Sequence, residues 1–374
     1  MKKLLLIAAL LVSANIAFAF DVKTDAKQAY PTFKVSGWIK VTYQDTIYRD
    51  TSVTYPSGFE VKDAALVVSG DVWTDVGYSI YIQGNRKNKL NDKNETAVKT
   101  GESVLTPRLV GAYIDWKVNS WFNFRAGQYK KPIGLEQWTS PVNYDFINTA
   151  QITSKFVEST YDQGIMLFGK KSDISYWFSV YNGSPYDYKD KNWAKDVIGR
   201  VSYVPLTGMT VGGSVDYGTA DGAGPSFYRR HAGLEANYER GKLFVRGEFM
   251  IGQDDKVLAT DSVMVGAVKV KQAGLDRNLM RGGYLTVGYV PLSKLKVNVR
   301  GDMYRENCSW DLVTDGITAW WGKQESRVVI CNLGADYFLN PNTKVTLNYD
   351  VKLEDMALRP VKNNVLMAQL QVKF

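Results

Sequence analysis

Few residues of this 374-residue chain have the types that covalent catalysis or metal binding requires. His231 is the single histidine, and it lies near Arg229 and Glu235 in a segment with strand-like alternation. A nucleophile activated by this histidine would make an enzyme of the phospholipase or protease kind, but such a site needs geometry as well as residue types. Cys308 and Cys331 could form one bridge in an oxidising compartment, and they lack the spacing of a zinc site. We therefore expect no catalytic residue, no cofactor and no metal ion.

Charged residues are numerous and stand at alternate positions, where they would share one face of a strand. The net charge is +8, and the basic residues form no clustered run of the kind that binds nucleic acid. If this face lines a channel, an excess of Arg and Lys concentrates anions there. Its basic members are Lys34, Lys40, Arg125, Arg200, Arg229, Arg246, Lys294, Lys296, Arg300, Lys344, Lys352 and Lys373. Its acidic members are Asp63, Asp71, Asp216, Glu235, Glu248, Asp302, Asp336 and Asp350.

The elements that would position these charges are short strands, because alternation of period two recurs over residues 33–374. In residues 295–303, for example, every second residue is apolar or glycine, while Lys296, Arg300 and Asp302 stand between them. Each segment has about the 10 residues of a tilted membrane-crossing strand. The pattern predicts about 16 strands, which start near Phe33, Phe59, Gly77, Arg108, Trp121, Asp162, Asp173, Asp196, Met209, Tyr228, Lys242, Leu279, Lys294, Ser326, Thr343 and Asn364.

The connections between these strands alternate in length. Short turns are expected at 119–120, 171–173, 239–241 and 340–342. Long polar loops are expected near 87–106, 131–161, 184–193, 219–227, 253–278 and 306–325. Short turns at one end and long loops at the other are typical of a bacterial outer-membrane barrel, whereas a soluble sandwich shares only the alternation. The many aromatic residues, 10 Trp, 23 Tyr and 15 Phe, fit the two interfacial girdles of such a barrel.

The two ends of the chain fit export and insertion into an outer membrane. The chain begins with Met and two lysines, residues 4–12 are apolar, and residues 17–19 read Ala-Phe-Ala. This order of a basic start, an apolar run and a small-residue end predicts a signal peptide over residues 1–19. The remaining residues, 20–374, form one predicted barrel domain.

The last predicted strand alternates apolar residues and ends on Phe374. This ending resembles the assembly signal of outer-membrane proteins, so we expect barrel-assembly machinery as a partner through Phe374. Outer-membrane lipid and lipopolysaccharide are further expected partners of an integral barrel.

The most specific stretch of the sequence runs from Arg125 to Glu136 and reads RAGQYKKPIGLE. It resembles the phosphate-selective porin O and P family, in which a strand ends in a Gly-Gln-aromatic-Lys run followed by Pro, a turn and a Leu-Glu pair. Two later segments are similar to the same family, Asp-Gln-Gly-Ile at 162–165 and Tyr-Asn-Gly at 181–183. The resemblance covers most of the chain beyond the signal peptide.

The resemblance implies a 16-stranded homotrimer whose third long loop, at about 131–161 here, folds into the lumen as a constriction. Apolar and aromatic residues such as Ile133 and Phe156 suit a loop that packs inside a barrel. After Phe146 this chain has no charge over residues 147–150, where the family often has an acidic-basic pair. Arg125 is the first candidate for the pore lining, since its strand leads into the loop; the others are Lys130, Lys131, Glu136, Lys155, Arg200, Arg229, Arg246, Lys296 and Arg300.

The sequence therefore predicts an integral outer-membrane porin for passive diffusion of small hydrophilic solutes, with a mild preference for anions such as phosphate. The acidic residues interleaved with the basic ones argue against strong selectivity. Two other functions stay open at this stage. An outer-membrane barrel enzyme would show lipolytic or proteolytic activity, and a closed structural or adhesin barrel would conduct no ions.

Overall fold

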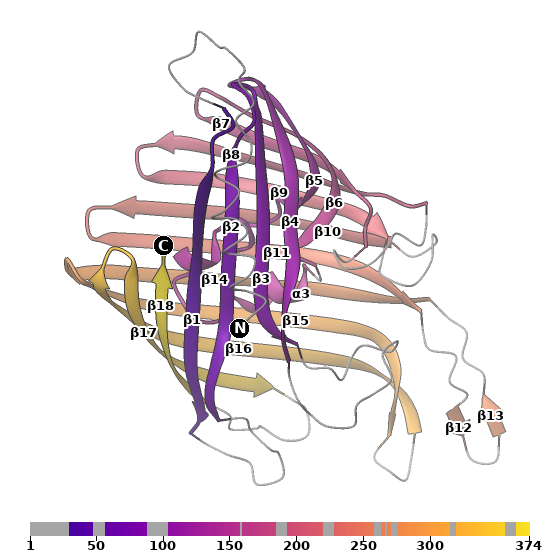
Figure 1. The fold of residues 1–374 in the computed structure, drawn as a ribbon. Coiled ribbons are helices and arrows are strands. Elements are labelled where there is room, and N and C mark those ends of the chain that lie inside the picture. Colours follow the sequence, from indigo (N-terminus) through magenta and orange to yellow (C-terminus); the bar gives the residue numbers. More distant parts are fainter. Residues whose placement is uncertain are drawn as a thin grey trace.

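Antiparallel strands close into a barrel in the computed structural model of the chain (Figure 1). The structure describes residues 30–47, 57–87, 104–157, 159–184, 193–219, 228–257, 263–265, 268–270, 275–314, 319–355 and 364–374. The predicted signal peptide lies outside the described residues. No helix in the described ranges is both long enough and apolar enough to cross a membrane.

The barrel in the described part of the chain has the 16 strands that the sequence predicts. They are β1 Lys34–Thr46, β2 Gly58–Asp71, β3 Val76–Lys87, β4 Val104–Asn119, β5 Phe122–Lys130, β6 Tyr161–Lys171, β7 Ile174–Tyr181, β8 Asp196–Leu206, β9 Met209–Thr219, β10 Tyr228–Arg240, β11 Leu243–Val257, β14 Leu275–Leu292, β15 Leu295–Thr314, β16 Ala319–Asn340, β17 Thr343–Asp355 and β18 Val365–Lys373. Two further short strands, β12 Val263–Val265 and β13 Val268–Val270, pair only with each other. Neighbouring barrel strands pair in sequence order, so each hairpin forms locally.

The first and last strands close the ring. β1 pairs antiparallel with β18, and the backbone N–H groups of Gly37 and Phe374 each donate to the carbonyl of the other at 2.9 and 3.0 Å. A closed barrel leaves no strand edge unpaired, which is the condition for placing strands in lipid. The terminal Phe374 therefore completes the seam.

Side chains on each strand alternate between the lumen and the outer surface, as the period-two pattern predicts. On β1, Lys40 and Thr42 are buried while Ile39 and Val41 between them are exposed. Exposed apolar residues recur on the outside of strand after strand, and polar residues fill the inside. This inversion of an ordinary soluble fold is what lipid outside and a hydrated lumen inside require.

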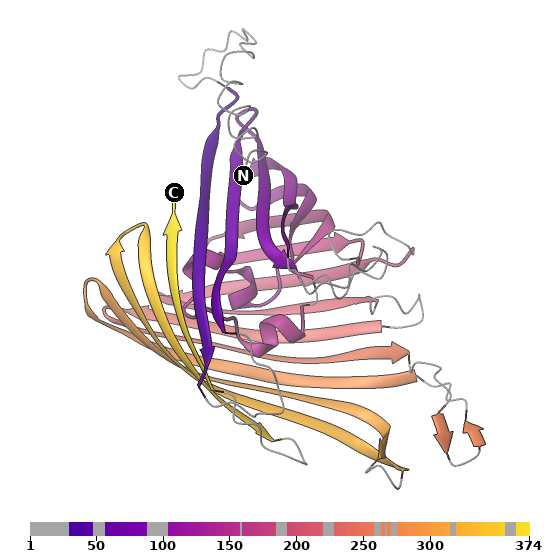
Figure 2. The same cartoon turned by 60° about the horizontal axis from the view of Figure 1, so that its bottom comes forward.

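One long connection, between β5 and β6, turns into the barrel. It carries two short helices, α2 Leu135–Trp138 and α3 Gln151–Lys155, with the 3-10 turn η3 Pro141–Asn143 between them. Figure 2 shows these helices inside the ring of strands. We call residues 131–160 the inner loop.

Apolar side chains hold the inner loop against one side of the wall. Ile133, Ile152 and Phe156 are at most 1% exposed and join one cluster with Tyr129 and Met166 of the neighbouring strands. Burial of each such side chain contributes about 1.5–3 kcal/mol. The loop is therefore a packed part of the barrel interior.

Candidate functional site

The inner loop begins with a carboxylate contact on the far wall. Glu248 of β11 accepts hydrogen bonds from the backbone N–H groups of Leu135 and Glu136, both at 3.1 Å. The N–H of Gly134 donates to the Ser214 hydroxyl of β9 at 3.2 Å. These N–H groups open a helix and have no partner within it, so the strand side chains satisfy them.

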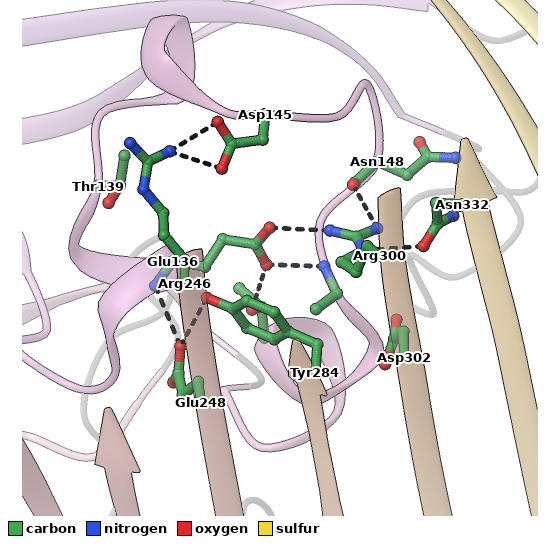
Figure 3. Close-up of polar contacts among 12 residues, drawn as sticks. Glu136, Thr139, Asp145, Asn148, Arg246, Glu248, Tyr284, Arg300, Asp302 and Asn332 are labelled. Atoms are coloured by element: carbon green, nitrogen blue, oxygen red, sulfur yellow. Dashed lines mark hydrogen bonds and ion pairs between the residues drawn. The ribbon is translucent and has the colours of Figure 1, made fainter. Parts of the chain in front are cut away.

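Glu136 joins the two halves of the loop to the wall (Figure 3). One of its carboxylate oxygens accepts from Arg300 Nη1 of β15 at 3.1 Å. The other accepts from the Ala150 backbone N–H and from the Thr153 hydroxyl, each at 2.7 Å. A single carboxylate thus fixes α2, the start of α3 and the wall relative to one another.

Asp145 makes a second junction in the same loop. It accepts from Arg246 of β11 at 2.6 Å (Figure 3). It also accepts from Lys296 of β15 at 3.1 Å. Burial opposes its ionisation, but the charges of Lys296 and Arg246 outweigh burial and lower the pKa of Asp145 below its ordinary value of 3.8. Asp145 is therefore a carboxylate at neutral pH, and it neutralises part of the basic wall.

Residues 147–151 of the loop form hydrogen bonds with strands β15 and β17. The Ile147 N–H donates to Asn348 of β17 at 2.7 Å, and the Gln151 N–H donates to Asp302 of β15 at 2.8 Å. Arg300 Nη2 donates to the Asn148 carbonyl at 3.1 Å. The loop consequently reaches from β5 and β6 across the interior to strands on the other side of the ring.

Two cavities of the described structure lie beside the inner loop, which contributes to the lining of each. The first, of about 480 Å³, is bordered by Leu135, Thr139, Val142, Asn143, Asp145, Asn237, Glu239, Arg246, Lys296, Phe338, Pro341, Asn342, Thr343, Lys344, Gln371 and Lys373. The second, of about 550 Å³, is bordered by Lys40, Lys62, Asp63, Tyr81, Gln83, Val110, Lys130, Pro141, Tyr144, Ile147, Asn148, Thr149, Ser154, Thr160 and Tyr161. The first includes residues of short turns, and the loop segment 141–148 contributes to both. The two cavities therefore adjoin this segment of the loop.

Three lysines of the second cavity donate to oxygens that carry no charge. Lys40 donates to the Pro141 carbonyl at 2.8 Å, Lys130 to the Thr139 carbonyl at 2.7 Å, and Lys62 to the Asn148 side-chain oxygen at 2.5 Å. Asp63 is the one carboxylate bordering this cavity, and it lies 4.0 Å from Lys40 Nζ. The cavity wall keeps a net positive charge.

Of the residues predicted to line the pore, Lys130, Glu136, Arg246, Lys296 and Arg300 meet at the inner loop through the contacts described above. The inward position of each follows from strict alternation on its strand or from the loop itself. What the sequence does not reveal is that Glu136 and the three basic residues of β11 and β15 act mainly as anchors.

Other predicted residues lie in ion pairs within the wall. Arg200 pairs with Glu235 at 2.5 Å, and Lys131 with Asp162 at 3.5 Å. Arg229 of β10 pairs with two carboxylates, those of Asp216 on β9 and Asp196 on β8. Lys155 is exposed on α3, with its Nζ 5.6 Å from the centre of the Tyr304 ring.

Arg125 faces the interior but is held by neighbours on the adjacent strands. Its Nε and Nη2 donate to both oxygens of Asp115 at 2.7 and 2.8 Å, and its guanidinium lies 3.8 Å from the centre of the Tyr113 ring. Tyr129 and Phe168 complete its aromatic surroundings. The structure therefore places its charge beside a carboxylate and away from the loop contacts that join β11 and β15.

Lys62 borders the second cavity at a position that alternation does not predict. The pairing of β1 with β2 shifts register between Lys40 and Val41, whose partners are Asp63 and Val61, so Lys62 is an extra residue. A bulge lets two successive residues face the same side. Lys62 and Asp63 thus both border the second cavity, and strict alternation from Asp63 assigns Lys62 to the lipid side.

Within the described ranges, no group of His, Cys, Asp and Glu residues has the arrangement of a metal site. Cys331 is a free thiol on β16.

A closed 16-strand antiparallel barrel with a polar interior, an apolar exterior and an inward-folded loop defines the class of outer-membrane porins. The family model of the phosphate-selective porin O and P family matches residues 33–374. The chain belongs to that family. It is an integral outer-membrane protein, which confirms the predicted fold class, location and porin function.

Solved structures share this fold at low sequence identity. The anion-selective porin from Comamonas acidovorans has a TM-score of 0.63 and 11% identity, with 92% of this chain and 100% of that chain covered. The outer-membrane channel DcaP of Acinetobacter baumannii has a TM-score of 0.60 and 11% identity, with 94% and 99% covered. OmpT of Vibrio cholerae, in a trimer form, has a TM-score of 0.61 and 9% identity, with 92% and 99% covered. A search of curated protein sequences finds no match.

Proposed function

We propose that this porin passes small hydrophilic solutes by diffusion and mildly prefers anions, phosphate among them. The observation that carries the proposal is the set of three lysines, Lys40, Lys62 and Lys130, whose charges face a cavity beside the inner loop and meet neutral oxygens. A low-dielectric wall focuses the field of such charges and raises the local concentration of anions.

The charged residues around both cavities also favour anions over cations. Seven basic residues border them, Lys40, Lys62, Lys130, Arg246, Lys296, Lys344 and Lys373, against three acidic residues, Asp63, Asp145 and Glu239. The acidic residues and the ion pairs in the rest of the wall keep the preference mild. We assign no dedicated high-affinity anion site.

Planar-bilayer recordings test the sign of the preference. In a KCl gradient the reversal potential of the purified porin should show greater permeability to Cl⁻ than to K⁺. A cation-selective channel would contradict the proposal. Liposome swelling with neutral sugars of increasing size, and then with anions, measures the pore size and the charge preference together.

The inner loop serves in this proposal as the constriction. Its contacts with β9, β11, β15 and β17 hold residues 131–160 across the interior, where they narrow the path of a solute. Loop residues that border either cavity are then the residues that a permeating ion passes. A rigid constriction gives steady single-channel currents, and this is measured in the same recordings.

The enzyme alternative has less support. His231 is held at 2.9 Å by Asp254 and lies 3.8 Å from Asp216, and its ring meets Phe156 edge-on. Two carboxylates and an aromatic ring hold an imidazole in place, but they supply no hydroxyl or thiol nucleophile. A lipolysis and proteolysis assay of the purified protein tests this alternative, and we expect no activity above background.

We further propose a homotrimer, insertion by the barrel-assembly machinery through Phe374, and contact with outer-membrane lipid and lipopolysaccharide. The trimer form of the similar Vibrio cholerae barrel supports the first of these. The seam position of Phe374, with its two backbone hydrogen bonds to Gly37, supports the second. Mass measurement of the native complex tests the oligomeric state.

A further inference from the structure

Three arginines stand in one row across adjacent strands of the barrel. Arg281 of β14 is the register partner of Arg305 of β15, and Arg305 is the register partner of Arg327 of β16. Adjacent strands are about 4.8 Å apart, so the row spans about 10 Å. The next register position, on β17, is Asp355, where the basic row ends.

The row lies on the outer surface of the barrel. On β14, Met280 next to Arg281 is 5% exposed and faces the lumen, whereas Leu279 and Leu285 on the same face as Arg281 are 53% and 56% exposed. Alternation on the other two strands gives the same result. On β15, Tyr304 is 2% exposed and Met303 is 44% exposed; on β16, Asn332 is 2% and Leu333 is 44% exposed. Arg305 and Arg327 share the face of the exposed members.

The height of the row coincides with the outer edge of the membrane-crossing band. β15 begins at a short turn with Leu295, so a strand of roughly 10 residues, the length that crosses the apolar layer, ends close to Arg305. Between the short turns and the row, the outward residues of these three strands carry no charge. They are Gly283, Leu285, Val287, Tyr289, Val297, Val299, Gly301, Met303, Val329, Cys331, Leu333, Ala335, Tyr337 and Leu339.

Three like charges at opposed positions repel one another, and the repulsion is stronger at the edge of an apolar layer. An anion placed between them removes this cost. Guanidinium groups match phosphate oxygens with paired hydrogen bonds, and each has five N–H donors. Arg305 and Arg327 also interact with other groups of the chain, so a bound phosphate would add to the contacts that these side chains already make.

We propose that Arg281, Arg305 and Arg327 form a binding site for the phosphorylated headgroup of an outer-leaflet glycolipid, the lipid A part of lipopolysaccharide. The long-loop end of an outer-membrane barrel faces the cell exterior, where this lipid lies. Toward the membrane, the outward position of Gly301 opens onto free space, so an acyl chain has room to lie along β15 below the headgroup. The proposal rests on the proposed contact of the barrel with lipopolysaccharide, and it is independent of the selectivity of the pore.

Binding of lipid A to the detergent-purified porin, followed by native mass spectrometry, tests the site. Diphosphorylated lipid A should bind the natural protein, and its binding should weaken about fivefold for each arginine replaced, or about 100-fold in the R281Q/R305Q/R327Q variant. The single variant R281Q serves if the triple variant does not fold, as judged by the gel mobility of the closed barrel.

The control variant is R230Q. Arg230 is also exposed and outward-facing, on β10, but it stands outside the row, so R230Q should bind lipid A like the natural protein. Two further probes identify the source of the phosphate. Lipid A without phosphates should bind weakly, and inorganic phosphate alone should not compete. The proposal would be overturned if R281Q, R281Q/R305Q/R327Q and the natural protein bound lipid A equally well. It would also be overturned if the dephosphorylated lipid bound as well as lipid A, or if inorganic phosphate competed fully.

Discussion

Arg300 and Glu136 lie 164 positions apart in the sequence, and the Nη1 of Arg300 donates to Glu136 at 3.1 Å inside the barrel. The same guanidinium donates to Asn332 of β16 at 2.8 Å and to the backbone carbonyl of Asn148 at 3.1 Å. With only 1% of Arg300 exposed, each of these bonds is shielded from solvent. One wall residue thereby holds two separate parts of the inner loop.

Arg300→Met should release this loop. Removing one partner of a buried pair leaves Glu136 and the Asn148 carbonyl without their donor, which costs about 3–5 kcal/mol. Guanidinium unfolding of the detergent-solubilised barrel measures the loss of stability. Single-channel recordings should show larger and noisier currents, because the released loop no longer holds one position.

The double variant Glu136→Gln with Arg300→Met is the control for this pair. Because it removes both charges, it should recover part of the stability that Arg300→Met loses. Strictly additive effects of the two substitutions would mean that Glu136 and Arg300 are not coupled.

Replacement of Lys40, Lys62 and Lys130 by Gln should reduce the anion preference of the pore. Their charges face a cavity and meet neutral oxygens, so their removal lowers the local potential directly. We expect the ratio of Cl⁻ to K⁺ permeability to fall by a factor of about 2 to 10. Reversal potentials in a KCl gradient give the ratio.

Lys242→Gln is the matched control for the lysine variant. Lys242 also donates to a backbone carbonyl, that of Pro291, but it is exposed in a short turn outside the cavities. Its replacement should leave the permeability ratio unchanged. A similar loss of anion preference in both variants would point to the net charge of the whole protein as the cause.

The sequence predicts the strands well because lipid outside and a polar lumen inside impose strict alternation. Thirteen of the 16 strands begin within one residue of the predicted position; β4, β14 and β16 begin earlier, at Val104, Leu275 and Ala319. These three extend at their long-loop ends. There, the strand no longer has lipid on one face, so the apolar-polar alternation that marks a strand is lost.

The site is less predictable, because alternation gives the face of a side chain but not its partner. Arg125 and Lys130 are both predicted to line the pore, yet Arg125 meets the carboxylate of Asp115 and Lys130 meets a carbonyl. Only the pairing of strands and the course of the loop decide this difference. Lys62 faces the cavity through a bulge, which a period-two pattern cannot encode.

The pairing of Asp145 with Arg246 and Lys296 should withstand mild acid. The pKa of Asp145 lies below 3.8 in the folded protein, so its pairing with Arg246 and Lys296 stabilises the fold fully above that pH. As the pH falls through the lowered pKa, Asp145 is protonated and this contribution is lost. Single-channel conductance should therefore change below about pH 4, as Asp145 is protonated.

Asp145→Asn tests whether this residue is the cause of the acid response. At neutral pH the variant should show the conductance that the natural porin shows in strong acid, and it should respond less to further acidification. An unchanged response in Asp145→Asn would assign the effect to other carboxylates of the wall.

Gly134 directly precedes α2 in the inner loop, and its backbone conformation, φ +69° and ψ 164°, is nearly restricted to glycine. An added Cβ would also stand 2.1 Å from Oε1 of Glu248, the carboxylate that accepts the Leu135 and Glu136 N–H groups. Gly134→Ala should therefore strain the backbone and displace Glu248, with a total cost of about 3–5 kcal/mol in guanidinium unfolding. Gly241→Ala is the matched control: its φ is +60°, but its Cβ would meet no atom within 4 Å, so only the strain of about 1–2 kcal/mol remains. If both variants lost the same stability, the contact between Glu248 and the loop would contribute nothing to holding the constriction in place.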